Sequence, residues 1–464
     1  MASLLADLRP HTPLRWSARL GYAVGDFGCN LYWQSVALFL YFFYTDVLNI
    51  PPAAAGVAFA IASVYDAVAD PIMGAIADRT RTRWGRLRPY LWLGAVPLAL
   101  SFAAMFYAPK LDGMALLAYA TVSHVVMRTC YTAVNIPYLA LSARLSSDAG
   151  ERATLAGLRM MFAAAAGVLV AALLPRVVAV LGGEMAYFVV ASGIGLLATL
   201  ALLLCASSVR ELPHPAPDVD GARSTSLLKA ASADFLSFWP LLLRYRPLAQ
   251  IVGGVVVMSI ALTMFSKCLI YWFKYGLQRP EMIPAALLVP ALMIFLCSPV
   301  WSWVARRYSK RNAWIAGCAV AGCGYLGFWL NGSAAMPVVL AWIALVGAGV
   351  SSLYVNMWAM LPDTVELIEW RGGGRNEAKV AGFAVFAQKA ALAVNAVLLG
   401  FLLDAAGFVS NQALSTSTLA GIKAVMCGVP LLGVIISFLL VRSYPISPAF
   451  HAQIVEELAR KKAA

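Results

Sequence analysis

Charged residues are scarce in this sequence. Asp, Glu, Lys and Arg together make up 12% of its 464 residues, whereas 61% of the residues are hydrophobic. Soluble globular domains carry roughly 25% charged residues, so this composition excludes an ordinary soluble protein. The sequence instead predicts an integral membrane protein that crosses the bilayer many times.

Residues that build metal and nucleophile sites are also few. There are four histidines, of which His124 alone falls deep within an apolar segment, and the eight cysteines are scattered singly without a CxxC pair. Neither a disulfide framework nor a zinc site is indicated. A Gly-rich phosphate loop and a Ser/His/Asp set are not evident either. We therefore expect no enzyme and no cofactor, with a membrane enzyme or sensor as a remote alternative.

Twelve apolar segments are long enough to cross a bilayer as helices, which takes about 20 residues each. They fall near residues 20–46, 52–77, 89–107, 113–142, 154–181, 185–207, 246–276, 283–305, 312–331, 336–361, 378–405 and 420–442. The longest polar stretch divides them six and six. We predict an all-α membrane protein with six-helix bundles at 1–206 and 244–443, a linker at 207–243 and a tail at 444–464.

The net charge of +13 has two explanations. Nucleic-acid binding would need cations interleaved with stacking aromatics in a soluble domain. Here the Lys and Arg residues gather in loops on one side of the predicted helices, as at 79–88 and 306–311. An excess of Lys and Arg marks cytoplasmic loops. We therefore predict cytoplasmic termini, a location in the plasma membrane (the inner membrane of a bacterium), and no nucleic-acid partner.

The loop after the second segment has a degenerate counterpart after the eighth, at residues 305–311. Both loops are basic and occupy the same position in their half of the chain. A parallel repeat of six plus six helices is typical of the major facilitator fold. In that fold, substrate and ion bind near the bilayer midplane between the halves.

Two aspartates, Asp66 and Asp70, lie one helical turn apart inside the apolar segment 56–77. A carboxylate near the bilayer centre costs roughly 2.5 to 3.5 kcal/mol even on lenient insertion scales, unless it faces a wet cavity or binds a cation. The spacing puts both carboxylates on one helix face, where they repel unless a proton or a metal ion joins them. We predict that this pair binds a cation.

The first segment carries a polar and aromatic stripe at i, i+4 and i+7, made of Asp26, Asn30 and Trp33. Asp and Asn can bond to hydroxyl groups, and a Trp face can cover the apolar side of a sugar ring. The stripe therefore indicates a cavity for a hydroxylated solute. The alternative is that Asn30 bonds to another helix and Trp33 faces lipid.

The fourth segment carries Tyr131 and Asn135 on one face, with Thr132 three residues before Asn135. These residues fit an ion or substrate site, although a Thr is also common in helix packing. In the tenth segment, Tyr354 is a candidate substrate contact from the second half of the chain.

Three cations fall inside predicted membrane segments: Arg159, Lys267 and Lys389. Arg159 needs an acidic partner from another helix, for which Asp26 is the candidate, unless its side chain reaches the membrane interface. Lys389 lies too deep in its segment for its side chain to reach the membrane interface. It is a candidate counter-charge for the Asp66 and Asp70 pair. For Lys267, functional and structural interpretations stay open.

Two loops with mixed charge, at residues 78–88 and 363–375, lie at predicted cytoplasmic helix ends. Ion pairs between them could hold one access state of the two halves, and a solvated surface is the alternative. The candidate gating residues are Asp78, Arg79, Arg86, Asp363, Glu366 and Arg375.

Several motifs together resemble one family, the glycoside-pentoside-hexuronide:cation symporters, which include the melibiose permease. They cover nearly the whole chain in order. The motifs are Gly25-Asp26, Tyr44-Thr-Asp46, and residues 66–74, 78–89, 135–137, 148–152, 362–377 and 386–389.

The resemblance implies a symporter that imports a sugar or glycoside together with Na+ or H+, acting as a monomer in the lipid bilayer. A transporter of lysolipids or other amphiphiles is the alternative. The resemblance also implies a cation site, with Na+ as one occupant, at Asp66, Asp70 and Thr132, with Lys389 beside it. It implies substrate contacts at Asp26, Tyr131, Asn135, Arg159 and Tyr354.

Four positions depart from the melibiose permease. Ser63 stands where that protein has an Arg. Ala69 replaces an Asn ligand, which leaves the choice between Na+ and H+ open. Asn135 replaces a sugar-binding Asp, and Leu139 replaces a Trp. These changes argue against a galactoside as the substrate.

Overall fold

A computed structural model of the chain describes residues 14–145, 149–183, 185–209, 211, 240–331, 335–372 and 377–463. The first half contains α2 (Trp16–Ser35) with the π-helical turns η1 (Val36–Leu40) and η2 (Phe43–Val47), α3 (Pro52–Arg79), α4 (Arg88–Met105), α5 (Gly113–Leu145), α6 (Ala149–Leu181) and α7 (Ala186–Ser208). The second half contains α9 (Arg246–Tyr271) with η3 (Trp272–Gly276), the short η4 (Pro280–Met282), α10 (Ile283–Arg307), α11 (Lys310–Asn331), α12 (Met336–Trp370), α13 (Glu377–Ala405) and α14 (Thr416–Val441). The helix α15 (Pro448–Ala463) follows.

Each of the twelve predicted membrane segments is helical, so the prediction of an all-α membrane fold is confirmed. The largest difference in bounds is at α12, which continues to Trp370 with Pro362 inside it, beyond the predicted end at 361. Among the described residues, nine helices are long and apolar enough to span a membrane by length and composition alone. The helices α2, α4 and α5 are not among the nine. Two of these, α2 and α5, carry five of the polar residues that the sequence singled out: Asp26, Asn30, Tyr131, Thr132 and Asn135.

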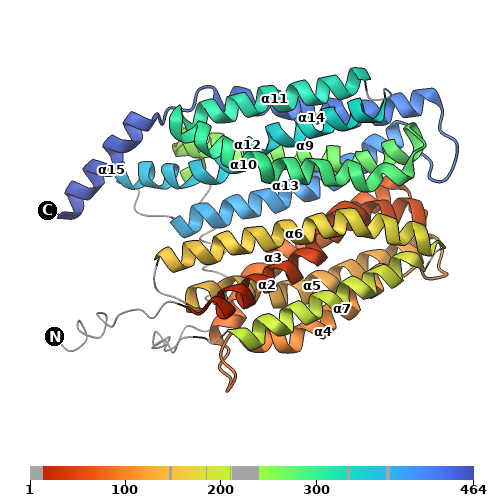
Figure 1. The fold of residues 1–464 in the computed structure, drawn as a ribbon, viewed down its shortest axis with the longest axis horizontal. Helices are drawn as coiled ribbons and strands as arrows, with labels where there is room; N and C mark the ends of the chain where they lie inside the picture. Colours follow the sequence, from red (N-terminus) through yellow and green to blue (C-terminus); the bar gives the residue numbers. More distant parts are fainter. Residues whose placement is uncertain are drawn as a thin grey trace.

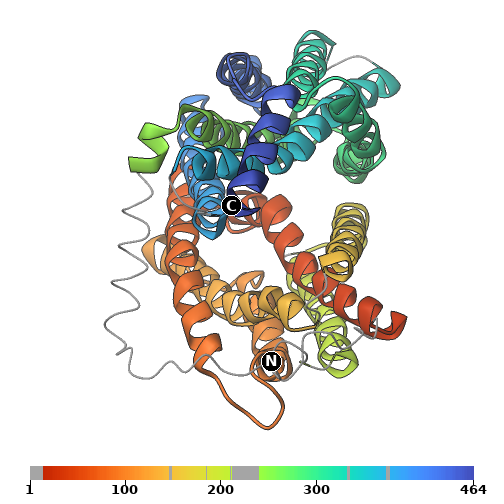
Figure 2. The ribbon, with the colours of Figure 1, turned by 90° about the vertical axis from the view of Figure 1, so that its left-hand side faces the viewer.

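The helices form two groups that lie side by side, α2 to α7 in one and α9 to α14 in the other (Figures 1 and 2). Across the boundary α3 packs against α13 and α6 packs against α10. The start of α2 and the helix α15 lie at the same end of the molecule, called the terminal end below (Figure 1). The boundaries of the predicted bundles and linker stay a prediction, since most of the linker lies outside the described residues.

Close packing of α3 on α13 depends on two glycines near the end opposite the termini. A Cβ atom at Gly56 would lie 2.6 Å from the carbonyl oxygen of Ala396, and one at Gly400 would lie 2.4 Å from that of Pro52. Small residues let helix backbones approach in this way in membranes. The two halves are therefore tightly apposed at this end.

The predicted cytoplasmic tail contains a helix, α15, that packs against the end of α12. The indole Nε1 of Trp370 donates a hydrogen bond of 2.6 Å to Glu457 Oε2. Ile454 is fully buried, and Phe450 contacts the Trp370 ring edge-on. The apolar side of α15 is thus covered by α12 and its neighbours.

Candidate cation and substrate site

The aspartate pair on α3 is joined by side chains from two other helices. The hydroxyl of Thr132 on α5 lies 2.9 Å from Asp66 Oδ1 and 2.9 Å from Asp70 Oδ1. The ammonium of Lys389 on α13 lies 2.9 Å from Asp66 Oδ2 and also bonds to Asp70. The predicted contacts of Thr132 and Lys389 with the pair are therefore confirmed. Lys389 links the halves, because α3 and α13 belong to different ones.

A further cation, Arg128 on α5, was missed by the sequence analysis. Its Nη1 lies 3.6 Å from Asp66 Oδ2, and its Nε donates a hydrogen bond of 3.3 Å to His124. The guanidinium also lies over the ring of Trp33, 5.1 Å from its centre. The available signal was its position one helical turn before Thr132, on the same face of an otherwise apolar segment.

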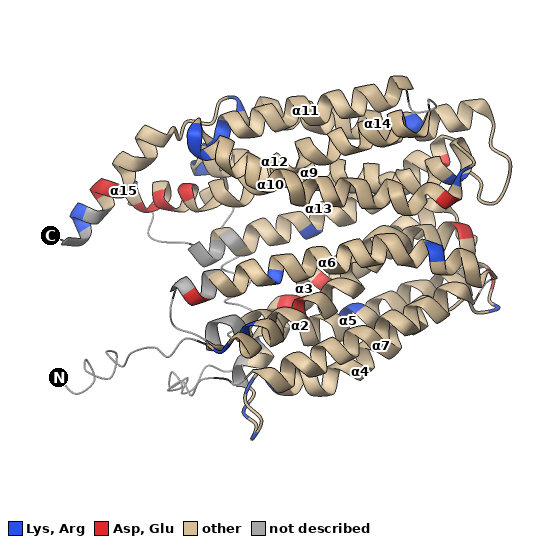
Figure 3. Ribbon diagram, viewed as in Figure 1, with Lys and Arg blue, Asp and Glu red and all other residues tan. Residues whose placement is uncertain are grey.

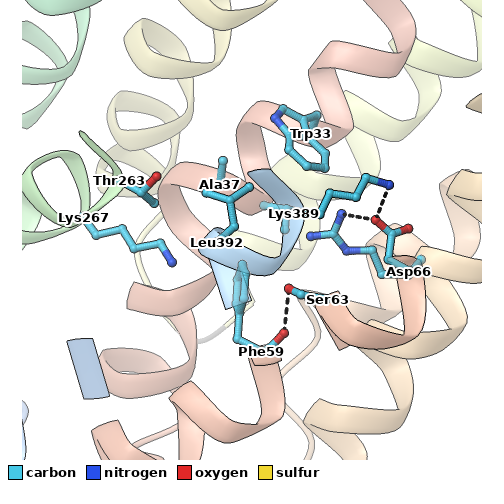
Figure 4. Close-up of a pocket in the computed structure, with 11 residues that line it drawn as sticks. Trp33, Ala37, Phe59, Ser63, Asp66, Thr263, Lys267, Lys389 and Leu392 are labelled. Carbon is cyan, nitrogen blue, oxygen red and sulfur yellow. Dashed lines mark hydrogen bonds and ion pairs between the residues drawn. The ribbon is translucent and has the colours of Figure 1, made fainter. Parts of the chain in front are cut away.

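Asp66, Lys389, Arg128 and Trp33 line a cavity between the two halves, with about 430 Å³ of empty space including space open to solvent. One half contributes residues of α2, η1, α3 and α5, and the other half contributes residues of α9 and α13. Figure 4 shows Lys267 reaching toward it from α9, opposite Asp66. The residues that matter below are Trp33, Phe59, Ser63, Asp66, Arg128, Thr263, Lys267 and Lys389.

A second buried ion pair joins α2 to α6. Its acid, Asp26, lies two helical turns before Trp33 on α2. Arg159 on α6 donates through Nε and Nη2 to Asp26 Oδ1, at 3.1 and 3.0 Å. The side chain of Asp26 is 5% exposed and that of Arg159 is 19% exposed, so the pair is largely withdrawn from solvent. The prediction that Asp26 is the partner of Arg159 is confirmed.

The two polar side chains of the stripe on α2, Asp26 and Asn30, are hydrogen-bonded to each other. Asn30 donates to the backbone oxygen of Asp26 at 2.9 Å and to its Oδ2 at 3.2 Å, so the described bonds of Asn30 stay within its own helix. Trp33 lines the cavity and packs against Tyr131, with ring centres 6.2 Å apart. The alternative interpretation, a lipid-facing Trp33 and an Asn30 bonded to another helix, is therefore wrong.

Of the seven predicted substrate contacts, only Trp33 belongs to the lining of this cavity, and the other six do not. Asn135 is half-buried on α5, one turn beyond Tyr131. Tyr354 lines a separate small pocket between α9 and α12, within the second half. The structure does not bring Tyr354 to the lining of the cavity that contains Asp66, and its role stays a prediction.

The predicted gating residues that the structure describes lie at the terminal end. Lys310 lies 2.7 Å from Asp363 Oδ1, and His451 of α15 lies 2.5 Å from Glu366 Oε2. These partners belong to the second half and its tail, so pairing across the halves stays a prediction. The backbone amide of Arg86 donates to Glu211. Arg375 and the side chains of Asp78 and Arg79 lie outside the described residues.

Contacts between the halves also occur at the opposite end. Asp46 in η2 lies 2.8 Å from the ammonium of Lys274 in η3 and accepts a hydrogen bond from Tyr275. The Asn411 side chain donates to the Asp46 backbone oxygen at 2.8 Å. Beside them, the hydroxyls of Thr45 and Tyr271 are 2.6 Å apart. This network joins η2, at the end of the first membrane segment, to the second half of the chain.

Two helical groups side by side with buried charges at their interface are typical of membrane transporters of the major facilitator fold. The profile of the family described as MFS/sugar transport protein matches residues 21–448, and the chain belongs to this family. The fold and the resemblance inferred from the sequence are thereby confirmed.

Relatives and solved structures agree with this assignment. The chain is 28% identical over 459 residues to the isoprimeverose transporter of Lactiplantibacillus pentosus, covering 97% of this chain and 93% of that protein. It is 27% identical to the glucuronide carrier protein homolog of Escherichia coli (strain K12), covering 97% and 96%. The nucleoside transporter NupG shares the fold, with a TM-score of 0.65 at 12% identity over 92% of this chain and 100% of that chain.

Proposed function

We propose that this protein is a symporter that couples the uptake of a sugar or glycoside to the entry of Na+ or H+. The observation that carries the proposal is the convergence of Asp66, Asp70 and Thr132 with Lys389 from the other half. Carboxylate and hydroxyl oxygens are hard ligands that suit a small cation or a proton. The Lys389 ammonium bonds to both carboxylates from the other half of the chain.

Lys389 and the coupling cation compete for the same two carboxylates. Two carboxylates this close repel each other, and either an ammonium or a bound cation relieves the repulsion. When a cation binds, the attraction that holds Lys389 and α13 to α3 weakens. A change in the contact between the halves is what alternating access requires, because ligand binding shifts the equilibrium between two states.

The substrate region lies beside this site. Asp26 and Arg159 offer charged hydrogen-bonding groups, and Trp33 with Tyr131 offers aromatic faces for a sugar ring. Asn30 and Asn135 are further candidates on the same helices. Since Trp33 also lines the cavity with Asp66, substrate and cation would bind within one connected region.

The choice between Na+ and H+ depends on how many oxygen ligands the pair can recruit. Ala69 offers no side-chain oxygen beside Asp70, which favours H+ over Na+. The terminal end is the basic one (Figure 3), and we place it in the cytoplasm of a bacterial inner-membrane protein. The network around Asp46 then closes the outer side in this state.

The test is solute accumulation by the purified full chain in proteoliposomes. A thermal-shift screen of mono- and disaccharides identifies the substrate, because a ligand that binds the native state stabilises it. Separately imposed Na+ and pH gradients then identify the cation. Asp66→Asn and Asp70→Asn are expected to abolish uphill accumulation while the protein stays folded.

The matched control is Asp112→Asn, the same change in an exposed loop between α4 and α5. It should leave accumulation unchanged. Full gradient-driven uptake by both cavity variants would refute the assignment of the coupling site.

A further inference from the structure

Arg128 is a buried charge that has no part in the coupling step described above. Its side chain is 6% exposed, and the side chain of Asp66 beside it is 3% exposed. A guanidinium withdrawn from water is costly unless other groups replace its hydration. Among the described residues, the contacts that do so are with Asp66, His124 and Trp33. The position of the guanidinium therefore depends on the charge of Asp66.

Two cations share one oxygen of Asp66, and Arg128 is the more weakly held of them. The Lys389 ammonium lies 2.9 Å from Asp66 Oδ2, and Arg128 Nη1 lies 3.6 Å from the same oxygen. The first distance is that of a hydrogen bond, whereas the second leaves electrostatic attraction alone. The guanidinium can therefore leave Asp66 without breaking a hydrogen bond to it.

The other attractive neighbour in the cavity is aromatic. Arg128 Cζ lies 5.1 Å from the centre of the Trp33 ring, inside the range of about 6 Å for attraction between a cation and an aromatic face. Trp33 lines the cavity together with Asp66. The second half supplies no acid to the described lining, which there consists of Thr263, Lys267, Lys389 and Leu392. Trp33 is therefore the cavity contact that remains attractive once Asp66 is neutralised.

His124 restrains the near end of the guanidinium. Arg128 Nε donates to His124 Nε2 at 3.3 Å, so this imidazole nitrogen is the acceptor. His124 is fully buried, and its ring packs edge-on against those of Phe59 and Tyr44. The terminal nitrogens of Arg128 are the part that can move. Rotation about the anchored Nε carries them between Asp66 and the face of Trp33.

We infer that Arg128 couples the cation site to the aromatic side of the cavity, as a movable counter-charge that shifts from Asp66 toward Trp33 when the cation binds. This inference rests on the proposed function and adds a residue to it. Na+ or H+ at the carboxylate compensates the charge that attracts the guanidinium. The terminal nitrogens then turn toward Trp33, where they can donate to the hydroxyl oxygens of a sugar on that ring.

The arrangement fixes the sign of the effect on each ligand. Arg128 and the coupling cation are both positive and lie at the same carboxylate, so Arg128 opposes cation binding. A sugar that engages the guanidinium draws it away from Asp66 and so strengthens cation binding, and the cation strengthens sugar binding by the same factor. Removal of the guanidinium should therefore raise the affinity for the cation. This sign is the same for Na+ and for H+.

Cation binding to the purified full chain, without any sugar, tests the first part. Na+ is titrated calorimetrically at fixed pH, and H+ binding is followed in Na+-free buffer by the infrared band of protonated carboxyl groups, with Asp66→Asn as the blank for each. Arg128→Met is expected to bind the coupling cation at least about threefold more tightly, because one positive charge beside the carboxylate is gone. Arg128→Lys, which keeps the charge, should bind it as the starting protein does. A folding defect would weaken binding, which is the opposite sign.

The fluorescence of Trp33 tests the second part. Because the chain contains 13 tryptophans, the contribution of Trp33 is taken as the difference between each protein and the same protein with Trp33→Phe. Movement of a charge beside an indole shifts its emission. Saturation with the coupling cation should therefore shift the Trp33 component in the starting protein and in Arg128→Lys, and leave it unshifted in Arg128→Met.

The matched control is Arg19→Met. Arg19 also lies beside a carboxylate of the first half, with Nε 2.6 Å from Glu151 Oε1, but it does not line the cavity. It should change neither the cation affinity nor the Trp33 component. Unchanged or weaker cation binding in Arg128→Met would overturn the inference. So would a Trp33 shift that persists in Arg128→Met, or equal effects of Arg128→Met and Arg128→Lys.

The outcomes separate this inference from the proposed function. If a cation gradient drives sugar accumulation but Arg128→Met binds the cation as the starting protein does, the inference is wrong and the proposed function stands. If Arg128→Met binds the cation more tightly and loses the Trp33 shift, but no gradient drives accumulation of a sugar, the inference stands and the proposed function is wrong.

Discussion

The Lys274 ammonium lies 2.8 Å from Asp46 Oδ1, and this pair connects the two halves of the chain at the end opposite the termini. The Asp46 side chain is 1% exposed and that of Lys274 is 28% exposed. A pair so placed is less screened by salt than a surface ion pair. It therefore stabilises the state in which this end is closed.

Weakening this pair should open that end more often. Lys274→Met is expected to raise the population of the open state about tenfold, corresponding to about 1.4 kcal/mol. The measurement uses Ser63→Cys, placed in the cavity of a variant without other cysteines. Its alkylation rate by an impermeant maleimide added to the side opposite the termini should rise.

Exchanging the two charges, as Asp46→Lys with Lys274→Asp, provides the control. It re-forms an ion pair between the same positions and should bring the alkylation rate back toward that of the starting protein. An unchanged rate in Lys274→Met would show that the pair does not hold this end closed.

Removing the Thr132 hydroxyl should change cation binding in a direction that distinguishes Na+ from H+. Thr132→Val keeps the shape of the side chain but removes the group that lies 2.9 Å from both Asp66 and Asp70. With Na+ as the coupling ion, we expect the Na+ concentration for half-maximal transport to rise roughly three- to tenfold, because Val supplies no oxygen ligand. With H+, we expect proton binding to strengthen instead, because the hydroxyl stabilises the charged carboxylates by donating to them.

The control for that change lies on the same helix. Thr129 is exposed and bonds to Tyr65, away from the carboxylate pair. Thr129→Val should leave the cation dependence unaltered. Equal shifts in both variants would assign the effect to helix α5 as a whole.

Breaking the second buried ion pair should cost stability as well as binding. Arg159→Met leaves the carboxylate of Asp26 buried without its counter-charge, a change that costs about 3 to 5 kcal/mol. Thermal unfolding of the purified protein should begin at a lower temperature. Arg176→Met, the same change at an exposed position of the same helix, should have little effect.

The partnership between Asp26 and Arg159 could be predicted because burial of each charge in an apolar segment demands compensation, and few acids were available. The same argument identified Lys389 as the counter-charge of Asp66 and Asp70. Hydropathy likewise predicted the helices, because a bilayer fixes the length of each apolar segment.

The pair between Asp46 and Lys274 could not be predicted in this way. Both residues lie near helix ends, where a charge within reach of water carries no evident cost, and their contact depends on how the halves dock. Lys267 was seen as a buried cation, but only the packing of α9 against α13 and η1 shows that it faces the cavity. Arg128 was missed although its depth was equally informative.

Docking of α15 should depend on pH through Glu457. Hydrogen bonds from Trp370 and Gln453 hold the pKa of the Glu457 carboxyl below its ordinary value. A carboxyl whose pKa is lowered in the docked state adds stability above its ordinary pKa, near 4.3, and this stability is lost as the pH falls through the lowered value. We expect α15 to separate from α12 progressively below about pH 4.3.

Spin labels at Ala452→Cys on α15 and Arg311→Cys on α11, both exposed positions, would report this separation as a longer distance in a variant without other cysteines. Other carboxylates also contact α15, so the informative quantity is the difference between variants. In Glu457→Gln, the part of the pH-dependent distance change that is due to Glu457 should be absent. In Glu456→Gln, which alters an exposed ion pair with Arg460, that part should remain. Identical pH profiles for all three proteins would exclude Glu457 as the titrating contact.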